Sequence, residues 1–288
     1  MAREPEPARS PSRLVAVSTA LFDGYSMETA VDEIAAGGAV AVEPAYIKGY
    51  VDFDETAFGD GAASRLSRLV TDAGLGIVAV SAHMDLGVRE AGEMLARRIA
   101  FAGMLGARFL ITNTGAVTAV HDIASVLEGV QKACEATGVC LALENPGHGG
   151  GDLLGTGSEG RAFLDTLDLP HLCLNYDVGN VFTFSREAIR PEQDIAGAMA
   201  RIGHVHLKDV LADRQGWTFT AIGDGSIDYP SLWKLLPGNI PVAIELPLRL
   251  DRSGRMEPVR RRERTDMASI RRAMRRSLDR VRQLDLPA

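Results

Sequence analysis

The chain has 288 residues, of which 46% are hydrophobic and 24% are charged, and its formal net charge is −7. This length is enough for one large hydrophobic core or for two smaller domains. No stretch approaches the ~18 consecutive apolar residues that a membrane-spanning helix needs, so no membrane partner is expected.

The charge is unevenly distributed along the chain. Residues 251–288 contain twelve arginines and six acidic residues, which gives this segment +6 and leaves −13 for the first 250 residues. Binding to duplex nucleic acid requires a basic surface, so the acidic body argues against a nucleic-acid partner.

The first residues and the cysteines indicate the cellular compartment. Residues 1–12 are charged and rich in proline and lack the apolar core of a signal peptide, which predicts a disordered leader ahead of a catalytic domain over 13–288. Cys134, Cys140 and Cys173 are odd in number and lie in apolar runs. They are typical of reduced core residues in a cytoplasmic protein.

Short β-type runs alternate with helical patterns from residue 14 onward. The runs are 14–18, 39–43, 76–82, 109–112, 139–144, 172–177, 203–208 and 242–246. Helical patterns between them include 61–73, 88–105, 121–137 and 190–201, and the glycines expected to end helices in a left-handed conformation are Gly37, Gly74, Gly138 and Gly203. Eight β-plus-α units without a break in composition predict an α/β fold, a single (β/α)8 TIM barrel. An open doubly wound sheet is disfavoured because the first strand–helix turn has no Gly-rich phosphate fingerprint.

The last helical pattern is strongly basic. Its apolar positions are Ile270, Met274, Leu278, Val281 and Leu284. This spacing predicts an amphipathic helix with a solvated arginine face, and the alternative is a contact with nucleic acid or another subunit.

The last four predicted strands each end in a residue that can bind a metal. These residues are Glu144, Asp177, His206 and Glu245. In a TIM barrel the carboxyl ends of the strands meet at the face that carries the active site. Buried charges persist only when they are paired or coordinated, so the pattern predicts one divalent cation at the barrel axis. Three carboxylates and one imidazole suit Mn²⁺, Mg²⁺ or Co²⁺ better than a structural Zn²⁺.

Side-chain alternation assigns roles within the segment HVHLKD. His204, His206 and Lys208 point to the same face of one strand, at successively higher levels. His206 lies nearest the level of the other ligands, and His204 lies one layer deeper as a supporting or core histidine. Lys208 is expected to reach from the rim toward substrate, with a solvated rim lysine as the alternative.

These residues resemble the xylose isomerase-like barrels, which are often labelled sugar phosphate isomerases/epimerases and share their fold with endonuclease IV. The resemblance also includes AIGDGSIDY after HVHLKD, LFDGYSMETAVDEIAAGGAVAVEP as a first unit, VSAHMDL as the third strand and LGARFLITNTG as the fourth. It implies one ion, usually Mn²⁺, held by the four residues at the strand ends. It also implies that Glu144 and Glu245 act as acid and base on a keto-sugar or related polyol through a metal-bound enediolate. Relatives are often dimeric or tetrameric, which implies a homodimer or homotetramer.

Two positions differ from the ketose 3-epimerases of this family. These enzymes have a histidine three residues after the aspartate ligand, where this chain has Asn180, and a substrate-holding arginine after the histidine ligand, for which Arg214 is the nearest candidate at a longer spacing. The differences leave open a metal-dependent dehydratase (lyase) of an inosose- or dehydroshikimate-like substrate. An endonuclease IV-like activity is not expected, because the chain has only six histidines, Asn113 stands where that enzyme would offer a histidine, and Asn180 replaces another ligand of its additional zinc sites.

Further residues are expected around the substrate. His83 and Glu43 end their strands on the same rim as the predicted metal and are expected to contact substrate, and Asn180 is expected to do so beside them. His148 lies in a Gly-rich segment that is interpreted as a mobile active-site loop. That loop is predicted to end at a capping pattern formed by Thr156 and Glu159.

The segment after the seventh β-type run contains two aromatic residues and a candidate helix cap. Trp217 and Phe219 form either an apolar wall over a sugar or ordinary loop packing, and Asp228 is expected to cap the following helix.

Overall fold

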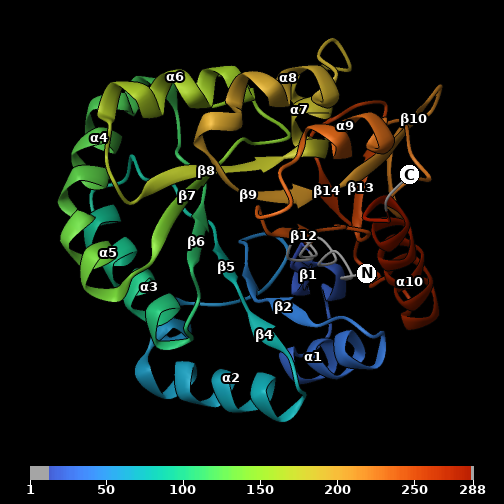
Figure 1. Cartoon of the computed structure of the whole chain (residues 1–288), viewed down its shortest axis with the longest axis horizontal. Helices are drawn as coiled ribbons and strands as arrows, with labels where there is room; N and C mark the ends of the chain where they lie inside the picture. Colours follow the sequence, from blue (N-terminus) through green and yellow to red (C-terminus); the bar gives the residue numbers. More distant parts are fainter. Residues whose placement is uncertain (1–12, 287–288) are drawn as a thin grey trace, which may run out of the picture.

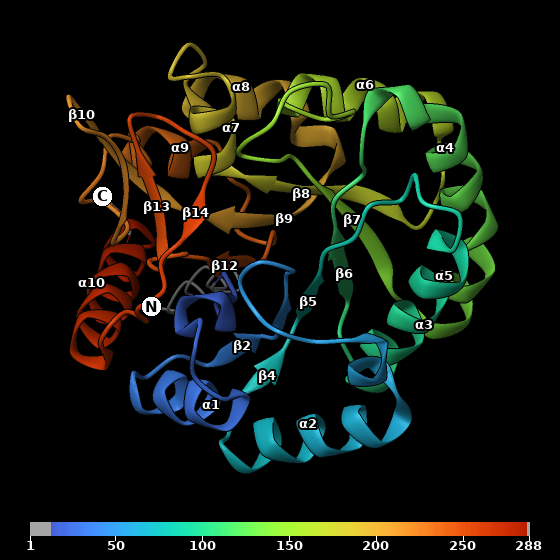
Figure 2. The same cartoon turned by 180° about the vertical axis from the view of Figure 1, so that it is seen from behind.

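The structure, a computed structural model, describes residues 13–286, and the leader predicted over residues 1–12 lies outside them. Parallel strands form the centre of the molecule, and the helices surround them (Figures 1 and 2). The strands of this central sheet are β1 (Val15–Ser18), β2 (Ala41–Glu43), β3 (Ala45–Tyr46), β4 (Gly76–Ile77), β5 (Ala79–Ala82), β6 (Phe109–Thr112), β7 (Cys140–Glu144), β8 (Leu172–Asp177), β9 (Ile202–Leu207) and β12 (Val242–Ile244).

The central sheet closes on itself. β2 and β3 follow one another along a single path that is interrupted at Pro44, and β4 and β5 follow another that is interrupted at Val78. The order of the strands in the sheet is β3-β5-β6-β7-β8-β9-β12-β1-β2-β4. At one end β2 pairs with β4, and at the other end β3 pairs with β5. Because β3 continues β2 and β5 continues β4, the two ends of the sheet join. This closure confirms the predicted (β/α)8 TIM barrel.

Each predicted β-type run contains barrel strands, with ends that differ by at most two residues. The run 76–82 is divided into β4 and β5 because the carbonyl of Val78 accepts the backbone N–H groups of Arg108 and Phe109. Burial on both faces explains why the strands are nearly continuous apolar runs.

The helices cover the outside of the barrel. They are α1 (Met27–Ala36), α2 (Asp60–Asp72), α3 (Ala91–Met104), α4 (Val120–Gly129), α5 (Gln131–Thr137), α6 (Gly157–Leu167), α7 (Val178–Phe184), α8 (Pro191–Ala198), α9 (Tyr229–Leu235) and α10 (Met267–Leu284), with short 3-10 helices at Thr19–Phe22, Glu55–Phe58, Val117–Ala119 and Met199–Arg201. The pattern 121–137 is two helices that meet at Val130, and 190–201 ends in a 3-10 turn. The predicted caps are confirmed: Thr156 and Glu159 form a capping box on α6, and Asp228 accepts the backbone N–H of Ser231 on α9.

Two of the four predicted helix-ending glycines are confirmed. Gly74 and Gly138 have φ values of +72° and +71°. The prediction for Gly37 was wrong, because its φ is −74° and Gly38 takes the left-handed conformation instead. The prediction for Gly203 was also wrong, because this glycine lies inside β9.

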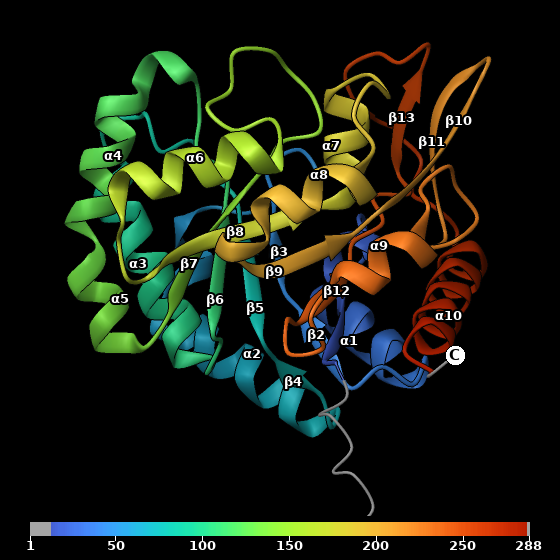
Figure 3. The same ribbon diagram turned by 45° about the horizontal axis from the view of Figure 1, so that its top comes forward.

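A second sheet departs from the carboxyl side of β9. Its antiparallel strands are β10 (Asp209–Asp213), β11 (Gly216–Thr220), β13 (Leu250–Ser253) and β14 (Val259–Arg260), and Figure 3 shows β10, β11 and β13 projecting on the side of α9 and α10. The carboxylate of Asp209 accepts the backbone N–H groups of Gly223 and Gly225. These hydrogen bonds fix the segment that leads from β11 back to the barrel.

α10 is the predicted amphipathic helix. Its buried residues include Ile270, Met274, Leu278 and Val281, and Leu284 is half-buried. Arg271 on its outer side donates from Nε to Glu33 Oε2 of α1 at 2.7 Å. None of the helices in residues 13–286 is both long and apolar enough to span a membrane.

Candidate metal centre and cavity

Four residues of the metal-ligating types converge at the carboxyl ends of the barrel strands. Glu144 ends β7, Asp177 ends β8, His206 lies near the end of β9, and Glu245 follows β12. All four are at most 2% exposed, and each offers a ligand atom within 4.8 Å of those of the others. In the parallel register Asp177 pairs with His206 across β8 and β9, Glu144 pairs with Asn175 of β8, and Glu245 lies one residue beyond the Ile244–Leu207 pair, so the side chains converge from slightly different levels.

The donor atoms of this cluster fit a divalent cation. His206 Nδ1 is 2.9 Å from Glu144 Oε2, 3.7 Å from Glu245 Oε2 and 3.8 Å from Asp177 Oδ2, but it makes no hydrogen bond. Glu245 Oε1 is also buried without a hydrogen-bond partner, and Asp177 Oδ2, which makes no aligned hydrogen bond, is approached by Lys208 Nζ at 2.7 Å. Buried polar atoms are normally paired, and a cation accepts lone pairs from atoms placed this way. The residues that would hold it are Glu144, Asp177, His206 and Glu245.

Glu43 lies beneath the cluster and not in the cavity. Its side chain is fully buried, and its Oε1 is 2.9 Å from His206 Nε2. The prediction that Glu43 binds a substrate hydroxyl therefore does not match its position. A proton on Nε2 of His206 satisfies Glu43 and leaves the lone pair of Nδ1 directed at the cluster, as carboxylates do behind many metal-ligating histidines.

A second polar chain supports Glu144 from below. His204, which is fully buried, contacts Asn175 Oδ1 through its Nδ1 at 2.8 Å, and Asn175 Nδ2 donates to Glu144 Oε2 at 2.6 Å. His204 Nε2 lies 3.6 Å from Glu43 Oε2. This arrangement places His204 as a supporting residue one layer below His206, as alternation along the strand predicted.

Lys208 is buried among the carboxylates. It is 3% exposed, so the alternative of a solvated rim lysine is wrong. Its Nζ lies 2.7 Å from Asp177 Oδ2 and 2.6 Å from Glu245 Oε2, and it donates to Asn180 Oδ1 at 3.2 Å. Asn180 in turn donates from Nδ2 to Glu144 Oε1, so its amide links the lysine to the opposite glutamate.

Burial and neighbouring charges set the protonation of the cluster. Burial alone raises the pKa of Glu144, but the neighbouring imidazoles of His206 and His83 outweigh it and hold that pKa well below its ordinary value. Burial also acts to raise the pKa of Glu245, but the nearby Lys208 and His206 outweigh burial, so this pKa is lowered as well. At Asp177, burial dominates the attraction of Lys208 and raises the pKa to about 7.

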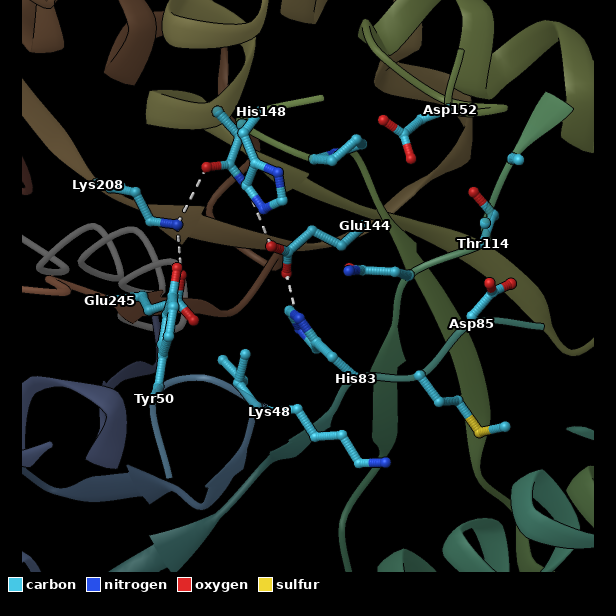
Figure 4. Close-up of a pocket in the computed structure, with 18 residues that line it drawn as sticks. Lys48, Tyr50, His83, Asp85, Thr114, Glu144, His148, Asp152, Lys208 and Glu245 are labelled. Atoms are coloured by element: carbon cyan, nitrogen blue, oxygen red, sulfur yellow. Dashed lines mark hydrogen bonds and ion pairs between the residues drawn. The ribbon is translucent and has the colours of Figure 1, made fainter. Parts of the chain in front are cut away.

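A cavity of about 480 Å³ opens above the cluster. Among the lining residues in Figure 4, Glu144, Glu245, His83 and Lys208 lie on one side, and His83 Nε2 is 3.4 Å from Glu144 Oε2. The size falls within the usual range for small-molecule sites.

Two of the three remaining predicted residues line this cavity, and the third does not. Asn180 and His148 line it, and His148 Nδ1 is 3.3 Å from Glu257 Oε2 in the turn between β13 and β14. Arg214 lies in the exposed turn between β10 and β11 and does not line the cavity, so the prediction that it holds substrate was wrong.

The alternative of loop packing is correct for the two aromatic residues of β11. Trp217 is buried, its Nε1 donates to Glu187, and the guanidinium of Arg252 lies 4.6 Å above its ring. Phe219 is also buried and outside the cavity lining.

Several residues of the site were not predicted. Asn145 joins β7 to β8, because its Nδ2 donates to the carbonyl of Asp177 and its Oδ1 accepts the N–H of Asp177. Asn145 directly follows Glu144 and Asn175 lies two residues before Asp177, so buried amides beside predicted ligands were a usable signal. Tyr50 and Asp85 also line the cavity, but they come from loops whose course the sequence pattern does not define.

Three solved structures have the same fold. An L-ribulose 3-epimerase has a TM-score of 0.70 and 20% identity, with 95% of this chain and 94% of that chain covered. A D-psicose 3-epimerase from Clostridium cellulolyticum H10, solved with D-tagatose, has a TM-score of 0.71 and 16% identity, with coverage of 95% and 99%. A 3-keto-D-glucoside 4-epimerase from E. coli has a TM-score of 0.65 and 15% identity, with coverage of 94% and 99%.

Comparison with curated proteins gives no match. A family model described as xylose isomerase-like TIM barrel matches residues 31–284. The matched range includes all four residues of the metal cluster and nearly the whole barrel. The chain therefore belongs to the xylose isomerase-like TIM barrel family.

Proposed function

We propose that this protein is a divalent-cation-dependent isomerase or epimerase of a keto-sugar or related polyol. The observation that carries the proposal is the convergence of Glu144, Asp177, His206 and Glu245 beneath a cavity of sugar-binding size. The three similar structures named above are sugar epimerases, which supports the same class of substrate. Mn²⁺, Mg²⁺ or Co²⁺ suits the donor set of three carboxylates and one imidazole.

When bound, the cation supplies positive charge that polarises the substrate carbonyl and stabilises an enediolate. Glu144 and Glu245 are the proposed catalytic residues that move the proton at the carbon next to that carbonyl. Both have lowered pKa values, so both are carboxylates near neutral pH and either can accept a proton. Lys208 Nζ, 2.6 Å from Glu245 Oε2, is positioned to hold a proton on that side of the substrate.

The proposal is tested by solvent exchange. Incubation with free keto-sugars and Mn²⁺ in D₂O is expected to introduce deuterium at the α-carbon of a substrate, measured by mass spectrometry and NMR. Glu144→Gln and Glu245→Gln are each expected to lower the exchange rate by about 10²- to 10⁴-fold, because each removes a group that moves the proton. Glu135→Gln, on the exposed side of α5, is the matched control and is expected to retain the rate of the unmodified protein.

The outcomes separate the alternatives. Exchange without change of composition supports the isomerase or epimerase, whereas loss of a water molecule from the substrate would replace it with the dehydratase. Full exchange activity in both glutamine variants would refute the assigned roles of the two glutamates.

A further inference from the structure

The cavity has a second, chemically different end. Opposite Glu144 and Glu245, its wall contains Asp85, Thr114 and Asp152, as Figure 4 shows. These residues come from the three loops that follow β5, β6 and β7. We refer to Asp85, Thr114 and Asp152 as the distal wall.

Backbone contacts fix the loops that carry the distal wall. Asp85 Oδ1 accepts the N–H of Gly87 at 2.8 Å. A Cβ at Gly115, whose φ is +119°, would lie 2.3 Å from the same oxygen, so only glycine leaves room for the Asp85 carboxylate. Asp152 and Ala116 form an isolated antiparallel β-bridge, and Leu153 N donates to Gly115 O at 2.9 Å.

The two carboxylates of the distal wall carry uncompensated negative charge. Neither Asp85 nor Asp152 has an ion-pair partner within 4.0 Å in the described part of the chain. Burial raises the pKa of Asp152, the charge of His148 opposes this increase, and the charges of Glu257 and Asp85 add to it.

His148 is the basic group of the cavity that acts on the distal wall, because its charge lowers the pKa of Asp152, but burial lowers the pKa of His148 itself and so favours its neutral ring. Lys208 is paired with Asp177 and Glu245 at the other end, and His148 contacts Glu257. Lys48 lines the cavity but is exposed, and the lining formed by residues 13–286 contains no arginine.

We propose that the distal wall binds the hydroxyl groups at the far end of the substrate and selects an uncharged polyol chain against a phosphorylated one. Ionised carboxylates accept hydrogen bonds from two hydroxyls at once, and the hydroxyl of Thr114 can donate or accept. A phosphate ester would place a charge of about −1.5 to −2 beside Asp85 and Asp152. At the opposite end, Glu245 Oε1 is buried, lacks a hydrogen-bond partner and belongs to a side chain that lines the same cavity, so a substrate held at the cluster has its far end at the distal wall.

This inference rests on the proposed function, and the experiment uses matched substrates. D-Fructose and D-tagatose are compared with their 6-phosphates, with Mn²⁺ present, by deuterium exchange and by calorimetric binding. The unmodified protein is expected to have a kcat/KM for the free ketose at least about tenfold above that for its phosphate, and to bind it correspondingly tighter, because of charge repulsion.

The double variant D85N/D152N removes the charge and retains the shape. The amide that replaces the Asp85 carboxylate keeps an oxygen that can accept the N–H of Gly87, so the loop is expected to keep its structure. The preference for the free ketose is expected to fall by about tenfold or more, mainly through activity gained on the phosphate. Asp122→Asn, on the exposed side of α4, is the matched control and is expected to leave the preference unchanged.

The failure of this inference is distinct from failure of the proposed function. A preference of the unmodified protein for the phosphate, or an unchanged preference in D85N/D152N, overturns the role of the distal wall while exchange still supports the enzyme class. If no sugar exchanges deuterium, the proposed function fails, and the calorimetric comparison still decides whether the distal wall selects against phosphate.

Discussion

At the scale of single residues, the metal cluster depends on the groups that orient it. His206 has a defined function for each ring nitrogen: Nε2 contacts Glu43 at 2.9 Å, and Nδ1 faces Glu144, Asp177 and Glu245. Without a carboxylate at position 43, either ring nitrogen could carry the proton. In the proposed enzyme, Glu43 would be a positioning residue that keeps Nδ1 free to bind a cation.

This role predicts the effect of Glu43→Gln. The variant keeps the volume of the side chain but weakens the contact that fixes the imidazole, so affinity for Mn²⁺ is expected to fall by about 10- to 100-fold. Calorimetric titration with Mn²⁺ measures the change, and Glu257→Gln, a glutamate of the exposed β13–β14 turn, is the control. Unchanged affinity in Glu43→Gln would exclude the positioning role.

The same residues show what the sequence could predict of the site. Alternation along β9 placed His206 at the cluster with Glu144, Asp177 and Glu245 and His204 one layer deeper, and the structure has the two histidines in these positions. Glu43 was misplaced because β2 is not a neighbour of β9, and only the closed barrel brings its side chain under His206. Arg214 was misplaced because the chain leaves the barrel after β9 in a hairpin, which no local pattern required.

At the scale of elements, the packing of β8 against β9 depends on Gly203. A Cβ at this position would lie 2.6 Å from Cys173 Sγ and 3.0 Å from Phe109 Cε1. The sequence suggested a helix end here because glycine commonly ends helices, whereas the glycine gives space to neighbouring side chains inside the barrel. The sequence shows where a glycine occurs, but it does not show whether that glycine ends a helix or leaves space for neighbouring side chains.

Gly203→Ala is therefore expected to destabilise the fold. Overpacking in a close-packed core costs about 1–3 kcal/mol of the free energy of unfolding, which urea denaturation followed by circular dichroism measures. The combination with Cys173→Ala is expected to recover part of this loss, because it removes the nearest clashing atom.

Gly129→Ala provides the matched control for that experiment. Gly129 is exposed near the end of α4, and a Cβ there would meet nothing within 4 Å. This substitution is expected to be neutral or to stabilise the protein by about 0.5–1 kcal/mol, because alanine favours the helix. Equal stability of Gly203→Ala and the unmodified protein would show that β8 and β9 can separate to admit the methyl group.

At the scale of the whole molecule, barrel closure and the metal cluster are linked. Glu144, Asp177, His206 and Glu245 come from four strands that are adjacent in the order β7-β8-β9-β12, and Glu43 ends a strand two positions beyond β12. A cation bound by the four ligands would contact residues that lie far apart along the chain. Since the unfolded chain cannot bring these residues together, binding must favour the folded barrel.

Thermal unfolding tests this coupling directly. Mn²⁺ at about one hundred times its dissociation constant is expected to stabilise the folded state by about 2.7 kcal/mol, which for a chain of this size raises Tm by roughly 4–5 °C. Chelation with EDTA is expected to reverse the increase, and His206→Ala is expected to abolish most of it, whereas His121→Ala, on the exposed side of α4, is expected to retain it. If Mn²⁺, Mg²⁺ and Co²⁺ all leave the Tm of the unmodified protein unchanged, the four side chains hold their positions through Lys208 and the surrounding hydrogen bonds alone. The barrel would then have to carry out any sugar chemistry without a cation at this cluster.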